Sequence, residues 1–392
     1  MTPDGSDLEP GGRSRARHLR GASLAGRDLH RIALAGADLA EADLEGAGLG
    51  GADLADANLE RSHLNGADLR GALLENARLT DASLRHADLR GATLEGAILR
   101  GADMWGADMR TADAASARFE GAHIEEATFD GADCTMASFQ GAIVRKVSFR
   151  NAILRQADLE GSLCGSLDFR GADLSGARLQ RLDLSNSHLD GIRLADAWLD
   201  RTVIRPEQVA DPLGEELARD YAGAGRAYFA LERNFATLGD SDSASRHRRR
   251  KRRMQKRAAR QSAALALASR RWERAAAHGG RWAMDEVAEL VCDYGESVPR
   301  VLRSILATYL LFVGLFAISG EVGRQVGGSV QPAGLGDVAI YSLIALTTQS
   351  NTPSGDIVIG GSLTSLLAAI EGLLGIGLLG LLGFVVGVKL HR

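Results

Sequence analysis

The chain has 392 residues, enough for two or three domains, but 47 Gly and only 5% aromatic residues argue against one ordinary large core. The formal net charge of −4 is unevenly distributed, because acidic and basic residues are concentrated in different parts of the chain. Cys134, Cys164 and Cys292 form no CxxC pair and adjoin no histidine pattern for zinc, so no metal site or disulfide framework is expected and a reducing compartment fits best.

The first half of the chain is a repeat. Residues 1–18 contain no apolar segment of the signal-peptide kind, and we expect them to be disordered. From Leu19 to Ile204 an apolar residue recurs at every fifth position, for about 38 repeats without a slip. Ala usually stands two residues before it, and Asp often one residue before it. A period of five fits neither a helix nor a flat strand, and its length indicates a solenoid.

Units such as ADLRG and ADLEG in this region resemble the pentapeptide-repeat family. The resemblance implies a right-handed quadrilateral β-helix over residues 19–205, with four repeats per turn and Leu or Phe pointing inward. About nine coils would then stack at roughly 4.8 Å into a rod about 45 Å long. Cys134 and Cys164 are six repeats apart, so they would lie on opposite faces and could not pair.

The surface of this rod is acidic but mixed. Residues 19–204 hold 29 Asp and Glu against 20 Arg and Lys, a net charge of −9. Asp68, Asp88 and Asp108 follow one another at intervals of four repeats and should stack in one column. Some proteins of the family mimic DNA and bind topoisomerases, but the alternative is that Asp belongs to the repeat and simply faces solvent. Basic residues interrupt the acidic field and favour the second interpretation: Arg61, Arg78, Arg100, Arg110 and Arg118.

A connector over residues 206–298 follows the repeat. Residues 215–238 have the apolar spacing of an amphipathic helix, and a helix over 282–294 is expected at the cytoplasmic membrane interface. Between them lies a polybasic run that sets topology and contacts anionic lipid, or else is a solvated linker. It has no interleaved aromatic residues, so nucleic acid is the least favoured partner. The candidate lipid-contacting residues are Arg248, Arg249, Arg250, Lys251, Arg252 and Arg253.

The last part of the chain, residues 299–392, contains two stretches that are apolar enough to cross a membrane. They are expected at about 300–319 and about 358–388. Basic residues precede the first stretch and follow the second, whereas the loop between them holds one, Arg324. The positive-inside rule predicts a multi-pass protein of the plasma membrane with both termini in the cytoplasm.

Between the two stretches, about 337–347 is too short to cross and fits a re-entrant pore helix. The order span, short helix, polar turn, span resembles the pore of two-span potassium-channel-like proteins. CDYGESVPRVL at 292–302 and LLAAIEGLLGIGLLGLL at 366–382 resemble the segments of bacterial pentapeptide-repeat proteins fused to such a pore. The resemblance implies a homotetramer, because one subunit supplies only a quarter of a pore.

The filter, about 347–356, departs from the family pattern TVGYG followed by Asp. Pro353 or a Gln-Ser-Asn run replaces the glycines that let carbonyl groups point at a dehydrated cation. We therefore expect a wider path with weak cation selectivity, in place of potassium selectivity. The candidate filter and pore-lining residues are Thr347, Thr348, Gln349, Ser350, Asn351, Thr352 and Asp356.

Glu371 lies inside the second apolar stretch, where an acid is costly and marks a functional candidate. It would either face the pore and attract cations or brace the re-entrant helix through hydrogen bonds. Gly375 and Gly377 are candidates for a gate hinge, with close helix packing as the alternative.

The leading hypothesis is a tetrameric ion channel of multidomain architecture, gated or localised by cytoplasmic β-helical rods. The alternative is a membrane-anchored scaffold whose rod binds a protein or ligand, and the DNA mimic is the third choice. We expect no enzyme activity, catalytic residue, metal or cofactor, because the sequence shows no nucleophile with a base, no metal spacing and no phosphate loop.

Overall fold

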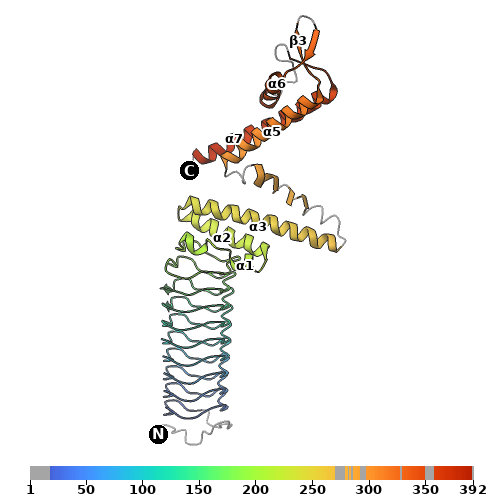
Figure 1. Ribbon diagram of the computed structural model, residues 1–392. Coiled ribbons are helices and arrows are strands. Elements are labelled where there is room, and N and C mark those ends of the chain that lie inside the picture. Colours follow the sequence, from blue (N-terminus) through green and yellow to red (C-terminus); the bar gives the residue numbers. More distant parts are fainter. Residues whose placement is uncertain are drawn as a thin grey trace. The chain divides into compact units, whose positions relative to one another are not determined.

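A computed structural model describes residues 18–269, 279–280, 282–283, 286–291, 297–326, 329–348 and 357–390. The expected disorder of residues 1–17 therefore lies outside the described residues. The chain forms two compact units, Met1–Ala258 and Ala259–Arg392 (Figure 1).

The first unit is built on a parallel β-helix (Figure 1). Parallel bridges join nearly every repeat to the fourth one after it, from His18 with Asp38 to Asp183 with Val203, so each turn contains four repeats. Only at β1 (Ile143–Val144) and β2 (Leu163–Cys164) does the bridging extend to two-residue strands. The quadrilateral fold predicted from the repeat is confirmed.

The five-residue unit fits this fold because each of its positions has a separate role. The central apolar residue and the Ala two positions before it are buried along the rod, with the partly buried Cys164 as an exception among the central residues. The residue two positions after the centre usually has a positive φ, such as 64° at Gly21 and 53° at Arg31. Gly adopts this left-handed turn without a steric penalty, which explains why it ends many of the units.

Aromatic side chains form two columns inside the rod. Phe119 stacks on Phe139 at 4.8 Å between ring centroids, and Phe149 stacks on Phe169 at 5.4 Å. The two members of each pair are four repeats apart, so the rings occupy the same side of successive coils. Cys134 is buried and Cys164 is partly buried, and both are free thiols, as their positions on opposite sides predicted.

Short elements cap the last coil: η1 (Pro206–Val209), α1 (Gly214–Leu217) and α2 (Tyr221–Thr237). The backbone groups at the end of a β-helix have no next coil, so they need other partners. The Glu215 carboxylate accepts from Leu194 N and Ala195 N at 2.7 and 2.6 Å. Asn234 accepts from Thr202 N and donates to Thr202 O, at 3.1 and 2.8 Å. The cap therefore ends the rod with paired backbone.

The polybasic run is a helix, α3 (Ser241–Ala268). Its buried residues Ala244 and Met254 belong to the same apolar core as α2. Packing of this face supplies the stabilisation that an isolated, highly charged helix would lack.

The second unit contains two helices that are long and apolar enough to cross a membrane, by length and composition: α5 (Val298–Ser319) and α7 (Ser362–Leu390). The shorter α6 (Leu335–Thr348) contacts both (Figure 1). A small antiparallel sheet has the order β4-β3-β5, with β3 at Val322–Val326, β4 at Ser329–Pro332 and β5 at Ile357–Ile359.

This sheet corrects one boundary. The second span was predicted to begin at about 358, but Ile357–Ile359 pairs with Val322–Arg324 as a strand, and α7 begins at Ser362. Hydropathy could not separate the strand from the helix, because both are apolar. The helices α5 and α6 begin within two residues of the starts expected for the first span and the short helix.

Candidate functional site

The short helix α6 is held by aromatic and apolar contacts with the two longer helices. Tyr341 on α6 packs edge-on against Phe316 of α5, with 5.2 Å between the ring centroids. Ala345 of α6 and Ala368 of α7 are buried in the same cluster. Small residues at these positions let the helices approach closely.

Only the start of the predicted filter lies in the described part of the chain. Thr347 and Thr348 form the last turn of α6, and Thr347 Oγ1 donates to Leu343 O at 2.7 Å. The remaining filter residues lie outside the described residues: Gln349, Ser350, Asn351, Thr352 and Asp356.

Glu371 of α7 is fully buried and faces α6. Ser342 Oγ donates to Glu371 Oε1 at 2.5 Å. Glu371 Oε2 and the hydroxyl group of Tyr341 are buried without a hydrogen-bond partner among the described residues. The carboxyl group therefore links α7 to the short helix, which is the bracing geometry.

The two glycines proposed as a hinge have different surroundings. A Cβ atom on Gly375 would lie 2.0 Å from Leu346 O, so α7 can approach the carbonyl end of α6 only because this side chain is absent. A Cβ atom on Gly377 would meet nothing within 4 Å among the described residues. Gly375 is thus a packing position, whereas Gly377 faces open space.

Glu321, which was not among the residues predicted from the sequence, joins the end of α5 to the start of α7. It follows Gly320, which ends α5 with a φ of 65°. Glu321 O accepts from Gly360 N at 2.8 Å, and Thr364 Oγ1 donates to Glu321 Oε2. A Cβ atom on Gly361 would lie 2.3 Å from that carboxylate oxygen. A lone acid directly after a helix-ending glycine was the available signal in the sequence.

Part of the polybasic run contacts the protein itself. Arg248 and Lys251 donate to the Glu232 carboxylate of α2, at 2.7 and 2.5 Å. Arg250 lies over the Tyr228 ring, 5.6 Å from its centroid, and donates to Ala210 O. These three candidate lipid contacts hold α3 against the cap. Arg249, Arg252 and Arg253 lie on other parts of the helix surface.

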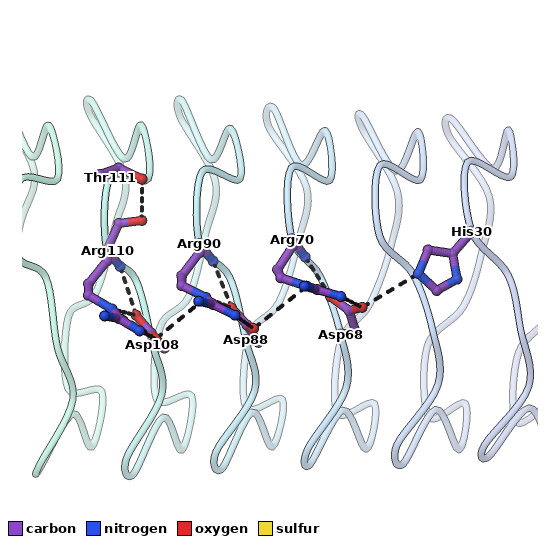
Figure 2. A network of polar contacts seen from close by, with 8 residues as sticks. All are labelled: His30, Asp68, Arg70, Asp88, Arg90, Asp108, Arg110 and Thr111. Carbon is purple, nitrogen blue, oxygen red and sulfur yellow. Dashed lines mark hydrogen bonds and ion pairs between the residues drawn. The ribbon is translucent and has the colours of Figure 1, made fainter.

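One face of the rod carries a ladder of alternating charge, drawn in Figure 2. The Arg70 guanidinium donates to both oxygens of Asp68 at 2.7 Å, and Arg90 and Arg110 pair with Asp88 and Asp108 in the same way. The hydrogen bond from Arg70 lowers the pKa of Asp68 to about 2.

The ladder sets the local net charge that the acidic column presents to a partner. Each Asp has an Arg two residues later, and Arg70 and Arg90 also lie 3.7 Å from the Asp of the following coil. The stacked column is therefore locally neutral. A DNA mimic needs a continuous negative field, which this face does not present.

A groove of about 610 Å³ lies between the last coil and α2. Trp198 and Phe229, which line it, are 57% and 52% exposed. Ion pairs of Arg226 with Asp196 and of Arg233 with Asp200 flank these rings. Two large, exposed aromatic rings beside paired charges are typical of a protein-binding surface.

Comparison with known proteins identifies the first half of the chain. The family model "Pentapeptide repeats" matches in eight copies that together cover residues 18–205. No curated protein matches the chain.

Solved structures of pentapeptide-repeat proteins are similar to the rod. HetL of the cyanobacterium Nostoc is 27% identical over 43% of this chain and 85% of its own, with a TM-score of 0.34. QnrB1, a plasmid-mediated fluoroquinolone resistance protein, is 22% identical over 53% of this chain and 98% of its own, with a TM-score of 0.30. A protein of the Arabidopsis thaliana thylakoid lumen is 37% identical over 21% of this chain and 66% of its own, with a TM-score of 0.17. Residues 18–205, the whole of the rod, thus match the family model for pentapeptide repeats.

Proposed function

We propose that the protein is a homotetrameric ion channel of the plasma membrane, with a weakly selective cation path, gated or localised by cytoplasmic pentapeptide-repeat rods. The observation that carries the proposal is the 14-residue helix α6, packed between two span-length helices and joined to α7 through Ser342 and Glu371. A helix of this length cannot cross a bilayer, and its polar C-terminal turn needs protein or water around it at membrane depth. Several copies gathered around water would supply both.

The test is reconstitution of the purified protein into planar bilayers. We expect a conductance with weak selectivity among monovalent cations, altered by replacing Gln349, Ser350 and Asn351 together with Ala. The subunit count is measured on the same sample by native mass spectrometry. A verified, inserted sample that carries no current, or that is monomeric, contradicts the proposal.

A second candidate is a membrane-anchored scaffold, which the exposed groove at Trp198 and Phe229 favours. This function predicts that the double variant Trp198→Ala, Phe229→Ala loses the phenotype that the wild-type protein produces in cells. The triple replacement at 349–351 should leave that phenotype unchanged. The channel proposal predicts the opposite sensitivity for residues 349–351.

A further inference from the structure

The polybasic helix α3 has two different faces. At 100° per residue, five basic side chains fall within an arc of about 100°. We name this arc the basic stripe; its members are Arg249, Arg252, Arg253, Lys256 and Arg260. On the helix surface it lies opposite His247, Lys251 and Met254.

The opposite face fixes the orientation of the helix. His247 and Met254 are only 3% and 2% exposed. The His247 ring stacks on Phe235 of α2 at 5.1 Å, and Lys251 pairs with Glu232 at 2.5 Å. Farther along α3, Arg257 donates to Glu216 at 2.9 Å. The stripe is therefore presented by a helix whose rotation about its axis is set by the cap.

We infer that the basic stripe binds the phosphate headgroups of an anionic bilayer surface. Five clustered cations complement such a surface, and each Lys or Arg near it raises the bound population about fivefold. The inference rests on the proposed function in one respect, namely that α5 and α7 are inserted in the membrane.

The chain itself argues for this partner. α5 begins about 30 residues after α3 ends, so the stripe is tethered within about 100 Å of the first span. A tether of this length gives the stripe a high effective concentration at the membrane surface. Residues 246–260 contain no Phe, Tyr or Trp on which bases could stack, which disfavours single-stranded nucleic acid.

The experiment uses the full-length protein in nanodiscs of pure phosphatidylcholine or of a two-to-one mixture of phosphatidylcholine and phosphatidylglycerol. An environment-sensitive dye is attached at Ala263→Cys, beside the stripe, after the native cysteines are replaced by Ser. Quenching by spin-labelled lipid reports contact with the surface. We expect at least twofold more quenching with phosphatidylglycerol, and loss of the difference in about 0.5 M salt.

The stripe variant replaces Arg249, Arg252, Arg253, Lys256 and Arg260 with Gln and should remove the effect of phosphatidylglycerol. The matched control removes the same charge from five exposed rod residues and should keep it: Arg31, Arg61, Arg181, Arg201 and Arg205. Equal loss in both variants would show a diffuse charge effect and would overturn the inference.

A second dye position separates this inference from the proposed function. A label at Leu310→Cys on α5 reports insertion. If the label on α5 is quenched but quenching at Ala263→Cys does not depend on phosphatidylglycerol, only the inference about the basic stripe is contradicted. If the label on α5 is not quenched, membrane insertion itself is contradicted. Binding of duplex DNA by the detergent-solubilised protein that depends on the stripe, without a response to phosphatidylglycerol, would assign the stripe to nucleic acid and overturn the inference.

Discussion

Single polar side chains perform structural work at both ends of this chain. Asn234 completes two backbone hydrogen bonds of Thr202 in the buried cap of the rod. Glu371 links two helices through Ser342 in an apolar unit. In both cases the partner group is buried, so losing the side chain leaves an unpaired polar group away from water.

Asn234→Ala should destabilise the first unit by about 2 to 4 kcal/mol, because Thr202 N and O both lose their partner. Chemical denaturation followed by circular dichroism measures the change. Arg233→Ala is the matched control on the same helix; Arg233 is exposed and its ion pair with Asp200 should contribute at most about 1 kcal/mol. Similar losses in the two variants would contradict a special role for Asn234.

Gly375→Ala should lower the thermal stability of the detergent-solubilised protein, because the new Cβ would overlap Leu346 O unless α6 and α7 separate. Overpacking of this kind typically costs about 1 to 3 kcal/mol. Gly377→Ala meets no neighbour among the described residues and should be neutral or slightly stabilising. A larger loss for Gly377→Ala would point to a hinge at that position.

At the scale of elements, α3 is held to the cap by a buried histidine. Burial lowers the pKa of His247 below its ordinary value, and the nearby Arg250 and Arg246 act in the same direction, although Nδ1 contacts Ser243 O at 2.8 Å. The rings of Tyr228 and Phe235 face the imidazole. The docked helix therefore favours neutral histidine.

Docking of α3 should accordingly weaken on acidification. Below the ordinary His pKa of about 6.5 the undocked state takes up a proton that the docked state does not, so stability is full above that pH and falls as the pH drops. Hydrogen exchange of residues 244–258 between pH 5 and 7.5 measures this. His247→Phe keeps the stacked ring and should abolish the slope; an unchanged slope would assign the effect to other groups.

Different elements were predictable to different degrees. The rod followed from its five-residue period, because each repeat contacts only neighbouring coils and its packing is local. The docking of α3 depends on Glu232 and Glu216, which lie outside the basic run, so charge density alone suggested a solvated linker. Glu371 was identifiable by the cost of an acid in an apolar stretch. Its partner Ser342, on a different helix, depends on how α6 and α7 pack.

At the scale of the whole molecule, the four-repeat turn is the unit in which the rod can change length. The charge ladder joins neighbouring Asp and Arg both within a coil and across coils. The phenylalanine columns also repeat once per turn. Both depend on the angular register of the coils.

Deleting residues 71–90 should shorten the rod by one coil, about 4.8 Å, and leave its melting temperature nearly unchanged. Asp68 and Arg70 would then stack beside Asp108 and Arg110. Deleting residues 71–80 instead places Arg70 beside Arg100 and should melt about 5 °C lower. Scanning calorimetry compares the two deletions, and equal melting temperatures would show that the columns do not contribute to stability.

Glu321 makes the pair of apolar helices mechanically asymmetric. The carboxylate and the backbone carbonyl of Glu321 accept hydrogen bonds that connect the C-terminal end of α5 to the N-terminal end of α7. At the far end Val301 and Val385 share an apolar cluster. In a bilayer, lipid acyl chains could replace such apolar contacts, but they cannot form hydrogen bonds with polar groups that have lost their partners. We therefore expect the two helices to separate more readily at the ends near Val301 and Val385 than at the end held by Glu321.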